Sequence, residues 1–351
     1  MQTPLIEEHR SAGAKLAEFS GCALPAEFAG FESEYRAARE SVALFDTNWH
    51  AMVSFAGPDR TRYLNAILTN NIQALTEGQG VRALLLNAQG HILAEFEVYA
   101  LAAKLLTFSH ASVRERTVRT LDKYIIMDDV ELEDTTDQEG SFAIEGPRAA
   151  VIVEQACRVA LEDMPEMAIR DVTIERMPCR LLRRSHWGQP GAEFIAKREW
   201  LPLLWQKLLA GVRARGGEPV GMSALNALRL EAQAPWFPAD FNDTVIPQEA
   251  GLEATHISFT KGCYTGQEIV ERVRSRGHVN RKRVNLRFST SSSPPIGAKV
   301  RANGADVGAI TSSAFSPAAG RAIGMAYVRR EHNAPGSALQ LEGGTTTATV
   351  V

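Results

Sequence analysis

A single cysteine, Cys263, has neighbours that favour a reactive thiol. It lies in the segment KGCYTGQEIVER (261–272), where Lys261 precedes it and a turn at Gly266 follows it. That turn predicts the start of a helix at about Gln267. A nearby ammonium group and the positive end of a helix both stabilise a thiolate, the form of cysteine that attacks electrophiles and binds metals. The segment therefore predicts Cys263 as a functional thiol with Lys261 as its partner, although a small buried cysteine beside a turn fits the same residues.

Other kinds of cysteine and histidine chemistry have less support in the sequence. The eight histidines have neither H-E-x-x-H nor H-x-H spacing, and the four cysteines are far apart, so no metal site is predicted. An iron–sulfur cluster normally takes four protein ligands, so a cluster at Cys263 would need a second chain or a small thiol. A nucleophile that pairs Cys263 with His256 or His278 stays open, although no acyl-transfer motif accompanies it.

Charged residues at three other places have the types needed to hold a polar ligand. Glu193 follows the glycines of GQPGAEF at the predicted start of a strand, and Arg229 lies on one face of a predicted helix at 223–233. Glu95 and Glu97 share one face of another predicted strand, because side chains alternate along a strand. Taken as isolated residues, surface carboxylates and a structural arginine also explain the pattern.

Basic residues cluster after the cysteine motif. The cluster consists of Arg272, Arg274, Arg276, Arg281, Lys282 and Arg283. Such a run is commonly a solvated face, and beside Cys263 it also suits an anionic ligand tail. Aromatic residues for base stacking are absent between positions 265 and 287, so direct nucleic-acid binding is not expected.

The elements that must position these residues occur as a weak internal repeat. A strand pattern at 52–55 ends in Gly57-Pro58 before a helical pattern, and a strand pattern at 142–144 ends in Gly146-Pro147 before another. Paired strands follow in each copy, at 82–101 and 179–197, and a helix closes each copy. A strand, helix, hairpin and helix order used twice predicts two ferredoxin-like halves.

The C-terminal part of the chain has a different pattern. From about residue 283 onward, short strands alternate with turn residues, and the SSSPP loop (291–295) has a strand pattern on each side. This predicts a small all-β barrel. The chain is therefore expected to have an α+β fold in three modules: 1–135 and 136–282 as the two halves of a ligand-binding region, and 283–351 as the barrel.

Composition and charge limit the class of protein. With 351 residues, 45% of them apolar, the chain can bury several cores, and a net charge of -3 supplies no global basic field for nucleic acid. The cysteines form no pairing motif, and the first twenty residues have no apolar stretch. Apolar runs long enough to cross a bilayer are also absent. We expect a cytoplasmic protein in a reducing compartment without a membrane partner.

The motif KGCYTGQE resembles the signature of the YgfZ-type folate-binding proteins, a branch of the glycine-cleavage T-protein (aminomethyltransferase) superfamily. The similarity continues through IPQEAGL (246–252), ISF (257–259) and RSRGHVNRK (274–282). The resemblance implies two ferredoxin-like halves around a central funnel, with a C-terminal barrel. It also implies a tetrahydrofolate ligand or a one-carbon derivative, and a link to iron–sulfur proteins and tRNA thiomodification. Partners would then be the folate and iron–sulfur client or scaffold proteins.

The resemblance also implies roles for particular residues. Glu193 would accept the adjacent N–H donors of a pterin in a bidentate contact. Arg229 would meet a carbonyl or carboxylate of the ligand, which suits its planar guanidinium group. Trp49, Asn70 and Asn87 would line the same funnel.

One departure from the T-protein pattern concerns its catalytic aspartate pair. Where the T protein has GGIIDDL, this chain has Ala94 and Glu95 at the two aspartate positions. Alanine exchanges no proton, so the departure argues against aminomethyl transfer. Glu95 would be the remaining base.

Three functions are compatible with the sequence. The first is a tetrahydrofolate-binding accessory protein for the assembly or repair of iron–sulfur proteins, with Cys263 as the functional thiol. The second is a tetrahydrofolate-dependent one-carbon transferase or demethylase that uses Glu95. The third is a non-catalytic interaction scaffold in which Cys263 is dispensable. The motif around Cys263 and the missing aspartate favour the first.

Overall fold

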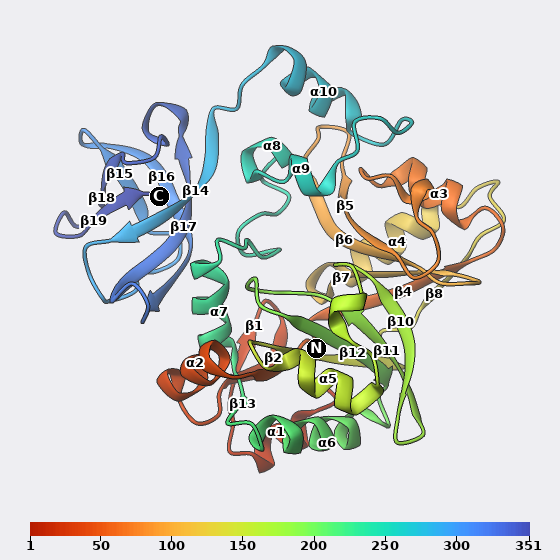
Figure 1. Ribbon diagram of the computed structural model, residues 1–351. Helices are drawn as coiled ribbons and strands as arrows, with labels where there is room; N and C mark the ends of the chain where they lie inside the picture. Colours follow the sequence, from red (N-terminus) through yellow and green to blue (C-terminus); the bar gives the residue numbers. More distant parts are fainter.

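The computed structural model describes residues 1–351, apart from the side chain of Arg276. Two sheets with helices on their outer faces form the body of the molecule, and a closed barrel lies beside them (Figure 1). The predicted α+β fold, with two halves and a C-terminal barrel, is confirmed. In the described part of the chain, helices with the length and hydropathy of a bilayer span are absent.

The first half is a five-stranded sheet in the order β5-β6-β7-β4-β8. Its elements are β4 (His50–Ala56), α3 (Arg60–Ile67), η1 (Ile72–Ala74), β5 (Gly80–Leu86), β6 (Ile92–Ala100), β7 (Leu105–His110), η2 (Ala111–Val113), α4 (Arg114–Tyr124) and β8 (Glu131–Asp134). Tyr63 and Leu64 of α3 and Leu121 of α4 pack on the outer face of this sheet, in one core with Phe96 of β6. The helices therefore cover one face and leave the other for the second half.

The second half is a six-stranded sheet in the order β10-β11-β12-β9-β3-β13. Its elements are β3 (Ala43–Asp46), β9 (Glu139–Glu145), α5 (Ala149–Cys157), η3 (Leu161–Asp163), β10 (Ile169–Ile174), β11 (Met177–Arg183), β12 (Gly191–Lys197), α6 (Leu201–Arg213) and β13 (Glu218–Pro219). The helix predicted to close the second copy is α6, and its apolar side is buried, with Leu204 and Trp205 against Phe142 of β9. The boundary between the two halves at residue 135 stays a prediction. β3 comes before this boundary in the chain, but it pairs with β9, which comes after it.

The two sheets meet through their inner faces. Tyr99 and Phe108 of the first sheet share a buried cluster with Leu182 and Ile195 of the second. A backbone hydrogen bond from Ile169 N to Gly78 O, 2.9 Å long, joins the two halves at one edge. The layers therefore run helix, sheet, sheet, helix.

The internal repeat is present in the structure, and each copy is longer than the sequence predicted. β4, α3 and α4 of the first half correspond in order to β9, α5 and α6 of the second. Three antiparallel strands, rather than a hairpin, lie between the two helices of each copy. The sequence analysis missed one strand in each, namely β7 and β10.

The N-terminal segment and four later helices surround the ends of the sheets. They are α1 (Ile6–Ser11), β1 (Lys15–Phe19), β2 (Cys22–Glu27), α2 (Phe31–Glu40), α7 (Met222–Glu231), α8 (Pro247–Ala250), α9 (Glu253–His256) and α10 (Gln267–Arg276). The helix predicted around Arg229 is α7, and the helix predicted from Gln267 is α10. α7 packs between β2 and the barrel, so it links all three modules.

The barrel closes in the order β14-β17-β16-β15-β18-β19. Its elements are β14 (Arg281–Phe288), β15 (Lys299–Ala302), β16 (Ala305–Ser316), β17 (Arg321–Arg329), η4 (Arg330–His332), β18 (Ala338–Leu341) and β19 (Thr347–Val350). Alternating side chains such as Leu286, Phe288 and Val350 fill its interior. The SSSPP segment is a loop between β14 and β15, as predicted.

Candidate ligand-binding site

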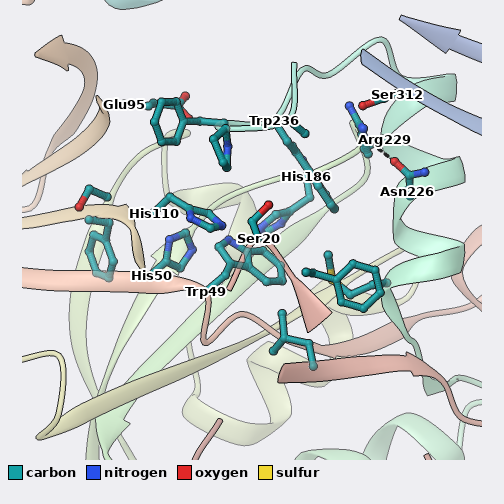
Figure 2. Close-up of a pocket in the computed structure, with 18 of the residues that line it drawn as sticks. Ser20, Trp49, His50, Glu95, His110, His186, Asn226, Arg229, Trp236 and Ser312 are labelled. Carbon is teal, nitrogen blue, oxygen red and sulfur yellow. Dashed lines mark hydrogen bonds between the residues drawn. The ribbon is translucent and has the colours of Figure 1, made fainter. Parts of the chain in front are cut away.

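A pocket of about 490 Å³ lies where the two sheets, α7 and the barrel meet (Figure 2). Volumes of this order are typical of small-molecule sites. The lining comes from the β1–β2 hairpin, from β4, β6 and β7, from the loop after β11, from α7, from the loop at 236–239 and from the barrel. The lining residues are Glu18, Phe19, Ser20, Leu24, Trp49, His50, Glu95, Glu97, Phe108, Ser109, His110, Arg184, His186, Met222, Ser223, Asn226, Arg229, Trp236, Phe237, Pro238, Ala239, Ile296, Ser312 and Ser313.

Two carboxylates reach the pocket from β6, as the alternation of side chains predicted. Phe96 faces the core, and Glu95 and Glu97 face the pocket. Glu97 Oε1 accepts a hydrogen bond from Arg82 Nε and forms an ion pair with Arg184, both at 3.2 Å. Burial disfavours the Glu97 charge, but these two guanidinium groups outweigh it and lower the pKa of Glu97 to about 2. Glu97 is therefore a fixed negative charge.

Glu95 is more exposed than Glu97 and has a different partner. Its side chain is 27% exposed, and its Oε1 lies 2.9 Å from Nε2 of His256, which is 5% exposed. His256 is the last residue of α9, close in sequence to Cys263. The contact therefore joins the pocket to the segment that carries the cysteine motif.

Glu193 lies directly behind the pocket lining and has no exposed surface. Its Oε1 accepts a hydrogen bond from Thr47 Oγ1, and its Oε2 accepts one from Arg184, both at 2.8 Å. Burial disfavours its charge, but Arg184 and His50 outweigh it, so the pKa of Glu193 is lowered. Both carboxylate oxygens thus have protein partners, and Arg184 stands between Glu193 and the pocket.

Two histidines of the pocket are neutral imidazoles. Burial lowers the pKa of His50 to about 3 and that of His110 to about 4. Arg184 donates to His50 Nε2 at 3.0 Å, so the proton of His50 is on Nδ1. The rings present polar edges to the pocket without carrying charge at neutral pH.

A buried carboxylate shapes the loop after β11. Glu145 accepts hydrogen bonds from the backbone N–H groups of His186, Trp187 and Gln189, at 2.6, 3.0 and 3.2 Å. This holds His186 against Trp49, whose ring also contacts Trp236 with a centroid distance of 5.8 Å. The loop and the tryptophans form the aromatic wall seen in Figure 2.

Arg229 lines the opposite side of the pocket from α7. It is buried, and it forms an ion pair with Asp240 and a hydrogen bond from Nε to Asn226 Oδ1 at 3.0 Å. Its guanidinium group lies over the Trp236 ring at 5.0 Å. Burial lowers its pKa, although Asp240 partly offsets this effect. The Arg229 guanidinium group therefore takes part in a structural ion pair and also forms part of the pocket wall.

The structure brings together only some of the residues predicted for the site. Trp49, Glu95 and Arg229 line the pocket, and Glu193 lies one layer behind it. Asn70 and Asn87 lie elsewhere: Asn70 Nδ2 donates to Arg82 O at 2.7 Å. Asn87 Oδ1 accepts from the N–H groups of Gln89 and His91, at 3.0 and 2.9 Å. Asn87 thus stabilises a turn, which is a common use of this residue, and Asn70 joins the segment after α3 to β5.

The sequence analysis did not single out several residues that shape the pocket. Arg184, His110, His186 and Trp236 each come from a loop or a strand end with no distinctive spacing. His50 follows Trp49 directly, so the string that indicated Trp49 also contained it. The remaining residues become neighbours only through tertiary structure.

Cys263 is exposed and lies outside the pocket lining. Lys261 Nζ donates to the carbonyl oxygens of Asn65 and Leu68, at the C-terminal end of α3. Burial lowers the pKa of Lys261 to about 8, an effect that the nearby Cys263 partly offsets. Lys261 therefore holds the cysteine loop on the first half through hydrogen bonds to backbone carbonyls.

The other three cysteines lie in packed surroundings. Cys22 and Cys179 are buried, and Cys157 donates a hydrogen bond to Val153 O at 3.1 Å. Burial raises the pKa of all three thiols, that of Cys179 to about 12. In the described part of the chain, no three His, Cys, Asp or Glu side chains are grouped to hold a metal ion.

The predicted basic cluster is divided in the structure. Arg274 stacks on Phe259 at 4.0 Å, Arg281 binds Glu249, and Arg283 donates to Ala250 O at 3.0 Å. The side chain of Arg276 lies outside the described residues. The cluster therefore contributes to packing between α8, α10 and β14 as well as to surface charge.

Two family models match the chain. The GCVT N-terminal domain matches residues 5–261, and the glycine cleavage T-protein C-terminal barrel domain matches residues 281–351. This chain belongs to the glycine cleavage T-protein family. Among T-protein relatives, it is 30% identical over 331 residues to an aminomethyltransferase of Rubrobacter xylanophilus, covering 94% of this chain and 87% of that one.

Further comparisons agree with the T-protein assignment. An aminomethyltransferase of Saccharopolyspora erythraea is 29% identical over 343 residues, with 97% of this chain and 93% of that one covered. The crystal structure of the glycine cleavage system aminomethyltransferase T from Bartonella henselae is similar with a TM-score of 0.90 and 24% identity, covering 100% of this chain and 96% of that one. The T-protein fold is therefore shared over the whole chain.

Proposed function

We propose that the chain binds tetrahydrofolate or a one-carbon derivative in the central pocket. We further propose that this folate site supports the assembly or repair of iron–sulfur proteins, including tRNA thiomodification enzymes, in the cytoplasm. Cys263 is the functional thiol in this proposal, and the partners are iron–sulfur client or scaffold proteins. The observation that carries the folate proposal is the pocket itself, and membership of the T-protein family supports it.

The pocket chemistry fits a folate. Trp49 and Trp236 supply aromatic faces beside which a flat heterocycle can stack. The uncharged imidazoles of His50 and His110 and the carboxylate of Glu95 supply hydrogen-bonding edges. In this proposal Trp49, Glu95 and Arg229 face the ligand, and Glu193 acts through Arg184 and His50.

Calorimetric titration with tetrahydrofolate tests the binding proposal. Trp49→Leu removes the stacking surface and should weaken binding about tenfold or more, whereas Trp200→Leu, at the start of α6 and away from the pocket, should leave it unchanged. Absence of binding by the wild-type protein, or equal effects of the two variants, contradicts the proposal.

A separate experiment tests the proposed contact between Glu193 and the N–H donors of the pterin ring. Glu193→Ala should weaken folate binding by roughly 10-fold to 1000-fold if the carboxylate helps to hold the ligand. Urea denaturation of the same variant separates this effect from a loss of folding stability. Unchanged affinity in a folded variant removes Glu193 from the site.

The role of Cys263 is tested in cells that lack the native protein. The exposed position of the thiol and the motif around it support a transient contact with a cluster, a metal or a client protein. Cys263→Ala should keep folate affinity and fail to restore iron–sulfur enzyme activity, whereas Cys157→Ala should restore it. Full restoration by Cys263→Ala would favour the scaffold function instead.

A second candidate function is a tetrahydrofolate-dependent one-carbon transferase or demethylase. It is favoured by the partly exposed Glu95 carboxylate in the pocket and by the names of the aminomethyltransferase relatives. Because Ala94 stands at one aspartate position, we expect no aminomethyl transfer. Release of methylenetetrahydrofolate from an aminomethylated lipoyl carrier, faster than the uncatalysed rate, would place this candidate first.

A further inference from the structure

A chain of three polar side chains runs from the pocket into the body of the protein. Glu95 Oε1 lies 2.9 Å from His256 Nε2, and His256 Nδ1 lies 2.7 Å from Thr255 Oγ1. Glu95 lines the pocket, whereas His256 is buried behind it. The partly exposed carboxylate is therefore backed by a buried imidazole.

Hydrogen-bond chemistry assigns the protons along this chain. A hydroxyl group can donate to an unprotonated Nδ1, and an ionised carboxylate can only accept. An ionised Glu95 carboxylate accepts from Nε2–H of His256, which leaves the lone pair on Nδ1. The Thr255 hydroxyl then donates to Nδ1 at 2.7 Å rather than to Leu252 O at 3.4 Å. The opposite tautomer would place the lone pair of Nε2 against the carboxylate.

The backbone of His256 is held in place by Thr69, in the segment between α3 and η1. Thr69 Oγ1 donates to His256 O at 2.7 Å, and Thr69 O accepts from Ser258 N at 3.1 Å. The same Thr69 hydroxyl accepts from Leu84 N of β5 at 2.8 Å. The backbone around His256 is therefore fixed to the sheet that carries Glu95.

We propose that His256 is a positioning residue for Glu95. It holds Oε1, so that Oε2 is directed to accept a hydrogen bond from an N–H group of a reduced folate. Within the described residues, hydrogen bonds to Glu95 involve Oε1 alone. This inference rests on the proposed folate site and adds to it a residue from α9, next to the cysteine motif.

The first test is independent of any ligand. Nitrogen-15 NMR of histidine side chains distinguishes the two imidazole tautomers by the shifts of Nδ1 and Nε2. His256 should show the proton on Nε2 at neutral pH, and Thr255→Val should weaken that preference. A wild-type spectrum with the proton on Nδ1 overturns the proposal.

The second test measures tetrahydrofolate affinity. His256→Gln keeps an amide N–H near the position of Nε2 and should bind within about threefold of wild type, whereas His256→Leu should bind about tenfold more weakly. His332→Leu, in η4 of the barrel, serves as a control and should bind like wild type. Equal binding by the Gln and Leu variants overturns the positioning role.

The two tests separate the positioning role from the proposed function. A wild-type protein that binds no tetrahydrofolate contradicts the folate proposal. In that case the tautomer of His256, measured by NMR, is the only test of whether His256 positions Glu95. If His256→Leu does not fold, Thr255→Val provides the affinity measurement. It should weaken binding less than tenfold and more than His332→Leu, and wild-type affinity in Thr255→Val counts against the proposal.

Discussion

Arg184 is the residue on which the charge balance of the pocket depends. It forms ion pairs with Glu97 and Glu193, at 3.2 and 2.8 Å, and donates to the neutral His50. Arg82 supplies a second guanidinium group to Glu97. Two buried carboxylates are thus matched by two guanidinium groups, so the floor of the pocket carries little net charge. A ligand meets polar edges there rather than an uncompensated charge.

The low pKa of Glu97 predicts a particular dependence of stability on pH. The pKa is about 4.5 in the unfolded chain and about 2 in the folded one, so the folded state binds fewer protons between these values. The stabilisation by Glu97 is therefore complete above about pH 4.5 and is lost as the pH falls towards 2. Glu97→Gln should be less stable than wild type at pH 7, and the difference should shrink by up to about 3 kcal/mol towards pH 2.

Urea denaturation of both proteins at several pH values measures this effect. Other groups also make the stability depend on pH: the lowered pKa of His50, for example, destabilises the fold as the pH falls below about 6.5. Both proteins share these groups, so the difference between their free energies of unfolding reports on Glu97. A stability difference that stays constant from pH 7 to pH 3 would show that Arg184 and Arg82 do not stabilise the Glu97 charge.

The four cysteines should differ sharply in reactivity. Cys263 is exposed, whereas burial raises the pKa of Cys22, Cys157 and Cys179. Because the thiolate reacts and burial excludes reagents, iodoacetamide at pH 7 should label Cys263 at least about tenfold faster than the others. Peptide mass spectrometry over time measures the four rates. Labelling of Cys22 or Cys179 at a similar rate would contradict the assignment.

At the scale of elements, the glycine turns that follow β4 and β9 restrict which residues the sequence can have at those positions. Gly57 has φ +93° and Gly146 has φ +140°, both in the left-handed region. A Cβ on Gly146 would lie 2.7 Å from Ser41 O, and one on Gly57 would lie 2.3 Å from Asp129 O. Each turn therefore requires glycine both for its backbone conformation and for the close approach of another segment.

Alanine substitution tests the second of these turns. Gly146→Ala combines left-handed strain with a clash against backbone and should lower the free energy of unfolding by more than about 2 kcal/mol. Gly211→Ala is a matched control because Gly211 lies inside α6, where a Cβ would be 3.6 Å from Ile152 Cγ2. The control should raise stability by about 0.5 kcal/mol or more. Equal stability of the two variants in thermal unfolding would refute this account.

Local patterns were sufficient to predict most elements and insufficient to predict their partners. Local patterns indicated the helices α6 and α7, and turn residues separated the barrel strands. The pairing of β3 with β9 and β13 depends on contacts distant in the sequence, and nothing in Ala43–Asp46 identifies those partners. The missed β7 and β10 lie in segments with weak alternation.

The same distinction applies to the candidate site. Local spacing placed Glu95 on a strand face and Arg229 on a helix face, and family resemblance pointed to both as candidates for the site. The burial of Glu193 could not be derived, because it depends on Arg184 and Thr47 from other parts of the chain. Family resemblance identified the residue, and only the fold shows that its carboxylate already has partners.

At the scale of the whole molecule, Asp240 joins the barrel to the pocket. Its carboxylate pairs with Arg229 of α7 and accepts from Thr311 Oγ1 of β16 at 2.7 Å. Its carbonyl oxygen accepts from Tyr327 of β17 at 2.8 Å. One buried residue thus fixes α7 and the barrel relative to each other, beside the ligand site.

Removal of this carboxylate should loosen the barrel. Asp240→Ala leaves the buried Arg229 without its ion-pair partner, and losses of about 3–5 kcal/mol are typical of such changes. Asp306→Ala, which breaks an exposed ion pair with Arg301 in the barrel, should leave the stability close to that of wild type. Calorimetry should show a separate barrel transition in Asp240→Ala alone. A single transition at the wild-type temperature would contradict this role.

The crossing of β3 into the second sheet also bears on how the protein is made. Synthesis proceeds from the N-terminus, and N-terminal segments usually fold first. Here Leu44 and Phe45, both fully buried in the finished protein, leave the ribosome before β9 and long before β13. Until Glu145 emerges, this apolar strand has no neighbour, and unpaired strands invite aggregation. A nascent chain halted near residue 135 would therefore be a substrate for chaperones and proteases rather than a folded half.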